Sequence, residues 1–153
     1  MKENIRIAIA VSEFNGDITL KMLDAAKAHA QNLNIKINYV CFVPGVFDMP
    51  LIIDELLQKQ EVDAVVTLGS VIKGETCHDQ VVAMNASRLI ADLSLKYHKP
   101  VTLGITGPNI TLTQANKRIV VVAKRAVDAA VIMTLRLRKL REKNIQTKMV
   151  VVN

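Results

Sequence analysis

Four short runs rich in Val and Ile recur along the chain, and a longer segment follows each of them. The runs are IRIAIAV, KINYVCFV, AVVTLGSVI and PVTLGIT, at residues 5–11, 36–43, 64–72 and 100–106. Most are almost continuously apolar, which is typical of strands buried on both faces of a parallel sheet. After the third and fourth runs, apolar residues recur three or four apart, which indicates helices. These residues are Val82, Ala86, Leu89, Leu93 and Tyr97, and then Ala115, Ile119, Val122, Ala126, Ala129, Met133, Leu137 and Leu140.

This alternation strongly limits the possible architecture. Strands that alternate with helices form right-handed crossovers, a parallel sheet and helices on both of its faces. The sequence therefore predicts an α/β fold, a three-layer α/β/α sandwich of flavodoxin-like type with a four-stranded parallel sheet. No repeat or linker interrupts the 153 residues. We expect one domain over residues 1–153, with 143–153 as a flexible tail.

Composition excludes several classes of protein. Two cysteines in no metal-ligand spacing predict reduced thiols and no metal site. The N-terminus has neither a signal peptide nor an apolar stretch of membrane-spanning length, so we expect a cytoplasmic protein without a membrane partner. Residues 96–153 carry 12 basic and 2 acidic side chains. A nucleic-acid partner for this basic half is disfavoured, because stacking aromatics and a binding motif are missing. Phosphate and an acidic protein surface remain as possible partners.

The third loop at the carboxyl edge of the predicted sheet has the most specific chemistry. Ligands of open parallel sheets bind at this edge, where KGETCHD follows the third strand. Thr76 and Asp79 have the spacing of a capping box, which predicts Thr76 as a helix N-cap and places His78 in the first turn. The N-terminus of that helix is suited to an anion such as phosphate, and His78 to proton transfer near neutral pH. A well-capped turn with an inert histidine is the alternative.

Other loops at this edge supply further candidates. Phe14 follows the first strand and is suited to stacking on a flat heterocycle, although it equally fits the top of a core. Asn15 adds a donor and an acceptor. Asp48 precedes Pro50 and either accepts hydrogen bonds from sugar-like hydroxyls or caps the next helix.

The fourth loop contains a second capping-box pattern. TLTQ at 111–114 predicts a helix start, and Arg118 lies about one turn into that helix. An arginine there can clamp a phosphate with two hydrogen bonds, or it is simply solvated. The same two alternatives hold for Arg125.

Taken together, four motifs resemble one enzyme family. They are FN at 14–15, VPGVFDMP at 43–50, LGSVIKGETCHD at 68–79 and GITGPNITLTQANKR at 104–118. In order and spacing, over about residues 5–140, they are similar to the 6,7-dimethyl-8-ribityllumazine synthase family, and HDQVV after GETC resembles its archaeal branch.

The resemblance implies an activity and assigns roles to the candidates. The family condenses 5-amino-6-(D-ribitylamino)uracil with 3,4-dihydroxy-2-butanone 4-phosphate and releases phosphate and water, without a cofactor. The resemblance implies that His78 transfers protons. The residues that it implies bind substrate are Phe14, Asn15, Val46, Phe47, Asp48, Ser70, Val71, Ile72, Glu75, Thr76, Leu103, Arg118 and Arg125. Among these, Phe14 stacks on the pyrimidine, Asn15 supports the ribityl chain, the backbone of residues 70–72 bonds the pyrimidine edge, and Arg118 binds phosphate.

The resemblance also implies self-association and has three departures. Family sites lie between subunits, in pentamers or in sixty-subunit shells. Asp48 stands where many members have Glu, Leu103 where Phe is frequent, and Glu75 where Ala or Gly is frequent. Two alternatives remain, a riboflavin synthase of the archaeal type and a binding or scaffold protein without turnover.

Overall fold

A parallel β-sheet forms the centre of the fold. The computed structural model describes residues 4–142 and 149–153. In these residues the strands are β1 (Arg6–Ser12), β2 (Lys36–Val43), β3 (Ala64–Ile72), β4 (Val101–Thr102) and β5 (Ile105–Ile110). Their order is β2-β1-β3-β4, β5 also pairs with β3, and every pairing is parallel. The carboxyl ends of the strands therefore meet at one edge, where ligands are expected.

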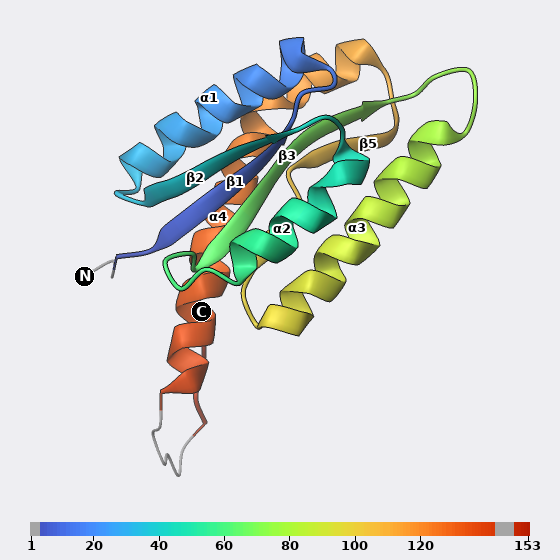
Figure 1. Ribbon diagram of the computed structural model, residues 1–153. Coiled ribbons are helices and arrows are strands. Elements are labelled where there is room, and N and C mark those ends of the chain that lie inside the picture. Colours follow the sequence, from blue (N-terminus) through green and yellow to red (C-terminus); the bar gives the residue numbers. More distant parts are fainter. Residues whose placement is uncertain (1–3, 143–148) are drawn as a thin grey trace.

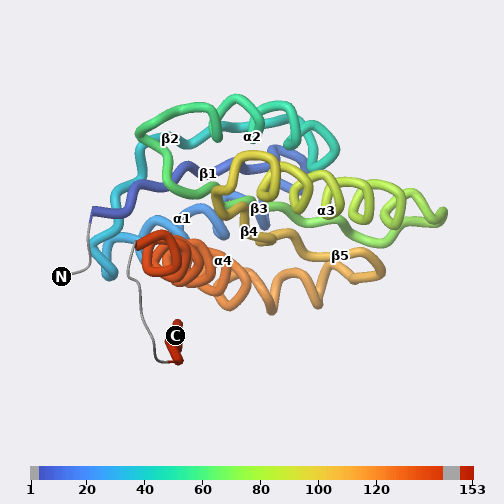
Figure 2. Tube along the Cα trace, turned by 90° about the horizontal axis from the view of Figure 1, so that it is seen from below, coloured from blue at the N-terminus to red at the C-terminus, as the bar shows by residue number. Residues whose placement is uncertain are grey.

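Helices cover both faces of this sheet. The helices α1 (Gly16–Asn32) and α4 (Leu112–Arg141) lie on one face, and α2 (Met49–Leu57) and α3 (His78–Tyr97) on the other (Figures 1 and 2). Side chains of β1 alternate between the two layers, with Ile7 and Ile9 packed in the α1/α4 cluster and Ala8 and Ala10 in the α2/α3 cluster. The predicted three-layer α/β/α sandwich is confirmed.

The sheet has five strands where the sequence predicted four, because the run at 100–106 is divided. Both β4 and β5 pair with β3, one after the other. Between them the hydroxyl of Thr67 donates to the Thr102 carbonyl (2.7 Å) and accepts from the Gly104 amide (3.2 Å), in place of backbone ladder bonds. A Cβ at Gly104 would lie 2.1 Å from the Thr67 carbonyl oxygen, so this approach requires glycine.

Two further expectations concern the helices and the tail. Within the described residues, none of the helices combines the length and the hydrophobicity needed to cross a bilayer. Of the predicted flexible tail, residues 143–148 lie outside the described part of the chain. In residues 149–153, the Val151 carbonyl accepts a hydrogen bond from the Lys139 ammonium (2.9 Å).

An ion-pair cluster of one carboxylate and two arginines joins β1, β3 and α4 at the amino edge of the sheet. Asp63 accepts hydrogen bonds from the backbone amide of Arg6 (2.7 Å) and from its guanidinium (3.1 Å), and the Arg138 guanidinium lies 3.4 Å away. Burial alone would raise the pKa of Asp63. The hydrogen bonds and the two positive charges outweigh burial, so its pKa lies below the ordinary value of 3.8.

This cluster predicts a pH-dependent contribution to stability. Asp63→Asn should lower the free energy of unfolding at neutral pH by about 2 kcal/mol, because charged hydrogen bonds to a largely buried group are lost. A lowered folded pKa means that the contribution is complete above the unfolded value and is lost as pH falls through the folded value. Urea titrations from neutral pH down to about pH 2 should show the difference between wild type and variant shrinking.

A surface pair provides the control for this measurement. Arg88 and Asp92 lie 3.8 Å apart on exposed α3, so Asp92→Asn should change stability by less than about 0.5 kcal/mol. A wild-type advantage over Asp63→Asn that stays constant across the whole pH range would contradict the assignment.

Candidate active site

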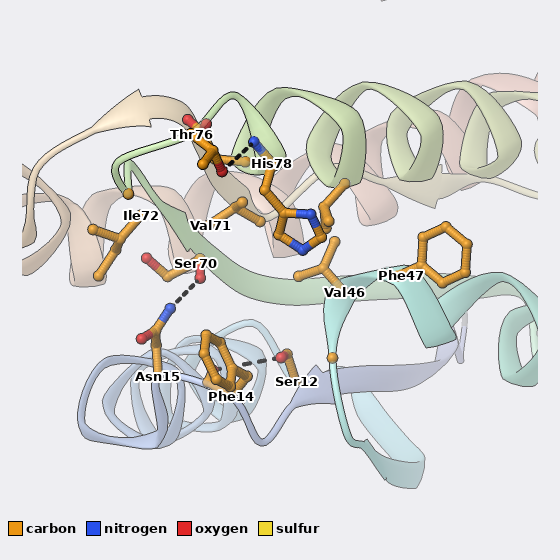
Figure 3. Close-up of a pocket in the computed structure, with 14 residues that line it drawn as sticks. Ser12, Phe14, Asn15, Val46, Phe47, Ser70, Val71, Ile72, Thr76 and His78 are labelled. Atoms are coloured by element: carbon orange, nitrogen blue, oxygen red, sulfur yellow. Dashed lines mark hydrogen bonds between the residues drawn. The ribbon is translucent and has the colours of Figure 1, made fainter.

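A pocket of about 490 Å³ opens at the carboxyl ends of β1, β2 and β3. We call it the Phe14 pocket. Three loops build it, and Figure 3 shows their side chains converging. Its lining residues are Ser12, Phe14, Asn15, Gly45, Val46, Phe47, Ser70, Val71, Ile72, Gly74, Thr76, His78, Asp79 and Val82. It lies at the edge where parallel sheets bind their ligands.

Two aromatic rings in this pocket are exposed. The Phe14 side chain is 72% exposed and that of Phe47 is 58% exposed, in a chain with only three Phe residues. The alternative that Phe14 tops the core is therefore wrong. His78 points its imidazole toward the strand ends from α3, and Phe14 lies on the opposite side of the pocket (Figure 3). Exposed rings beside a titratable side chain suit a flat, hydrogen-bonding ligand.

Asn15 fixes the floor of the pocket. Its backbone is left-handed (φ 58°), and its carbonyl accepts the first bonds of α1 from Ile18 (2.9 Å) and Thr19 (3.1 Å). Its side-chain amide donates to the carbonyl of Ser70 (2.7 Å). The Ser70 carbonyl is therefore already bonded within the chain, and the Asn15 side chain keeps its oxygen and its second N–H for a ligand.

The predicted capping box at Thr76 does not form. Helix α3 begins at His78 with Cys77 as its N-cap, and no side chain caps it. The Thr76 hydroxyl instead accepts from the His78 amide at 3.4 Å. Asp79 is 5% exposed, and its carboxylate bonds the backbone amide of Asn109 (2.8 Å). The Asp79 carboxylate, which the local pattern assigned to the helix cap, therefore accepts its hydrogen bond from a residue that is distant in sequence.

Two predicted residues in the loops that build this pocket do not line it. Asp48 is exposed, and one of its carboxylate oxygens accepts from the Gly45 amide (2.9 Å), which closes the turn before α2. Glu75 is exposed beside Thr76. Both are close in sequence to lining residues but are not among them.

The two arginines predicted to bind phosphate, Arg118 and Arg125, do not line the Phe14 pocket. Arg118 lines a pocket of about 360 Å³ along β5 and the start of α4. Leu103 and Arg125 line another of about 250 Å³, and Ile105 and Val122 belong to both. We call these adjoining pockets the Arg118 face. The Arg118 face and the Phe14 pocket share no lining residue.

The sequence missed Asp79 and Ser12 as lining residues. Asp79 was interpreted as half of a capping box, and its burial depends on β5, which is distant in sequence. Ser12 directly follows the predicted first strand and was given no role; it is 1% exposed and its hydroxyl donates to the Phe14 carbonyl (3.4 Å).

Comparison with known proteins identifies the family. The sequence profile described as 6,7-dimethyl-8-ribityllumazine synthase matches residues 4–138. The chain is 54% identical to the 6,7-dimethyl-8-ribityllumazine synthase of Methanocaldococcus jannaschii over 138 residues, which is 90% of this chain and 97% of the relative. The protein of that name from Methanothermobacter thermautotrophicus is 56% identical over 90% of this chain and 98% of the relative. That from Saccharolobus solfataricus is 54% identical over 92% of each chain. The chain belongs to the 6,7-dimethyl-8-ribityllumazine synthase family.

Proposed function

We infer that the protein condenses 5-amino-6-(D-ribitylamino)uracil with 3,4-dihydroxy-2-butanone 4-phosphate to 6,7-dimethyl-8-ribityllumazine, the penultimate step of riboflavin biosynthesis. Phosphate and water are released. The family match over residues 4–138 supports the reaction. The observation that carries the site is the Phe14 pocket, where exposed Phe14 and Phe47 flank His78 at the sheet edge.

In this proposal the Phe14 pocket holds the ribitylaminouracil. The ring stacks on Phe14, with Val46 and Phe47 on the other side, and backbone groups of residues 70–72 meet its polar edge. The side-chain oxygen of Asn15 accepts a hydrogen bond from the ribityl chain. His78 moves protons during imine formation and phosphate elimination. Each of these residues lines the Phe14 pocket.

We further propose that the Arg118 face of a second copy completes the site. Arg118 is exposed and lines a pocket that shares no residue with the Phe14 pocket, which supports a phosphate held between His78 of one chain and Arg118 of another. Leu103 and Arg125 line the adjoining pocket.

Exposed apolar side chains support the same arrangement. Leu51, Val81 and Met84 on α2 and α3 are 73%, 63% and 66% exposed, and on the Arg118 side Leu103 and Val121 are each 53% exposed. Two different apolar patches on one chain fit a head-to-tail contact, which closes into a ring. A pentamer, or a sixty-subunit shell of pentamers, is the assembly we propose. Sedimentation should give a multiple of five times 16.9 kDa; a fully active 16.9 kDa monomer contradicts the proposal.

The reaction is tested by mixing purified protein with both substrates and following the fluorescence of the lumazine. Signal above the uncatalysed rate, proportional to protein, is expected. Binding of the ribitylaminouracil without product would instead indicate a binding protein, and turnover of the lumazine itself would indicate a riboflavin synthase.

Stacking on Phe14 makes a separate prediction. Phe14→Ala should raise KM for the ribitylaminouracil roughly tenfold with little change in kcat, because stacking of an aromatic side chain on a base contributes about 1–3 kcal/mol. Phe42→Ala is the matched control, since Phe42 is 50% exposed on β2 and does not line the pocket. Equal KM values for the two variants would remove Phe14 from the binding site.

A further inference from the structure

Asp79 is a buried acid inside the Phe14 pocket to which neither the family resemblance nor the proposed mechanism gives a task. It is the second residue of α3, lines the pocket and is 5% exposed. Its carboxylate accepts a hydrogen bond from the backbone amide of Asn109 in β5 (2.8 Å). Burying a carboxylate is unfavourable unless it is hydrogen-bonded, so the fold depends on this contact between Asp79 and Asn109.

The segment that carries His78 is held at both ends by the same part of β5. At its start, the Lys73 amide donates to the Ile110 carbonyl (2.9 Å). At its end, Asp79 bonds the amide of Asn109, the residue just before Ile110. Every residue between these two contacts, 74–78, is exposed. The loop is therefore attached to β5 at its two ends, Lys73 and Asp79. His78 is the residue directly before the second attachment.

Within the segment itself, the hydrogen bonding is weak. Cys77 caps α3 without a side-chain bond, and the Thr76 hydroxyl reaches the His78 amide only at 3.4 Å. A bond of that length adds little. Asp79 thus provides the strong side-chain contact that orients the first turn of α3.

We propose that Asp79 is a positioning residue for the condensation. Its carboxylate fixes the first turn of α3 on β5 and so places the imidazole of His78 over the pocket. The inference rests on the role proposed for His78. A misplacement of about 1 Å can reduce a rate by roughly 100-fold, so a single anchor beside a proton-transfer group has a measurable effect.

Two substitutions separate the anchor from general stability. Asp79→Ala removes the acceptor and should lower kcat about tenfold, with both KM values changed by less than about twofold. Asp79→Asn keeps an oxygen at the same reach and should recover most of that loss. Asp92→Asn, on the exposed face of α3, is the control for an acidic residue lost from the same helix. If the Asp79→Ala variant does not fold, the Asp79→Ser variant is used in its place. The serine side chain stays polar but is too short to reach the Asn109 amide.

A double-mutant cycle shows whether Asp79 acts through His78. In a His78→Ala background, adding Asp79→Ala should cause almost no further loss of kcat, since the group being positioned is gone. Losses that multiply would overturn the proposal, as would a rise in KM for the butanone phosphate alone, which points to the Arg118 face.

Amide hydrogen exchange provides a readout that needs no turnover. Asp79→Ala should speed exchange at Asn109 and in the first turn of α3, while the rest of α3 stays protected. Unchanged exchange there would overturn the anchor itself. Faster exchange together with a fully active His78→Ala variant would show that the anchor exists and that the proposed role of His78 fails.

Discussion

Replacing Arg118 with alanine should lower kcat/KM about 1,000-fold, the largest single effect expected in this protein. The guanidinium bonds the phosphate as a handle in the ground state and as a leaving group when the bond to carbon breaks. The loss should appear in KM for the butanone phosphate and in kcat, while KM for the ribitylaminouracil stays close to the wild-type value. Steady-state kinetics with each substrate varied in turn measures this.

A neighbouring lysine distinguishes a specific arginine from general positive charge. Lys117 precedes Arg118 on the exposed surface of α4 and lines none of the three pockets discussed above. Lys117→Ala removes the same charge and should change kcat/KM by less than about threefold, the usual range for a surface substitution. Similar losses in both variants would indicate long-range attraction of the phosphate rather than direct binding.

Mixing two inactive variants tests whether Arg118 acts in a neighbour's site. Chains carrying Arg118→Ala keep an intact Phe14 pocket, and chains carrying His78→Ala keep an intact Arg118 face. After unfolding and refolding together in equal amounts, about one quarter of the sites in a head-to-tail ring should combine both intact halves. Activity well above that of either variant alone is expected. If mixing restores nothing, Arg118 and His78 serve the same chain.

The sequence predicted the elements better than their partners. The capping box of Thr111 and Gln114 forms in both directions, at 3.2 and 3.0 Å, because both partners are local. The box of Thr76 and Asp79 has the same pattern but does not form, because Asp79 bonds Asn109, thirty residues away. Spacing alone does not show which of two competing backbone N–H donors a carboxylate will accept from.

The apolar stripe of the last helix was predicted only in its first half. Ala115, Ile119 and Ala126 are buried as expected, but Met133 is 43% exposed and Leu140 is 66% exposed. The buried side chains after Ala126 are instead Val127, Ala130, Val131 and Thr134. Steps of three and four residues both fit an amphipathic helix, and their order over thirty residues depends on the surface against which the helix packs.

The division of the predicted site could not be read from one chain. Motif matching placed Arg118 and His78 in one list, and only the family resemblance implied a site between subunits; in the structure the two residues line different pockets. A site completed by a second copy gives the sequence no local signal, because the two halves need no contact within a protomer. The physical indications appear only in the structure, as an exposed arginine and exposed apolar patches.

Replacing His78 with alanine should lower kcat about 100-fold without abolishing turnover. Proton transfer by one positioned group accounts for that factor, while the holding of two substrates in line and the binding of the phosphate remain. Both KM values should therefore stay within about threefold, and added imidazole should restore part of the rate, because His78 is exposed and its removal leaves room in the pocket. His98→Asn is the control, since His98 is exposed at the end of α3 and asparagine tolerates its left-handed φ of 52°. A kcat equal to that of the wild type would remove His78 from proton transfer and leave positioning and Arg118 to supply the whole rate enhancement.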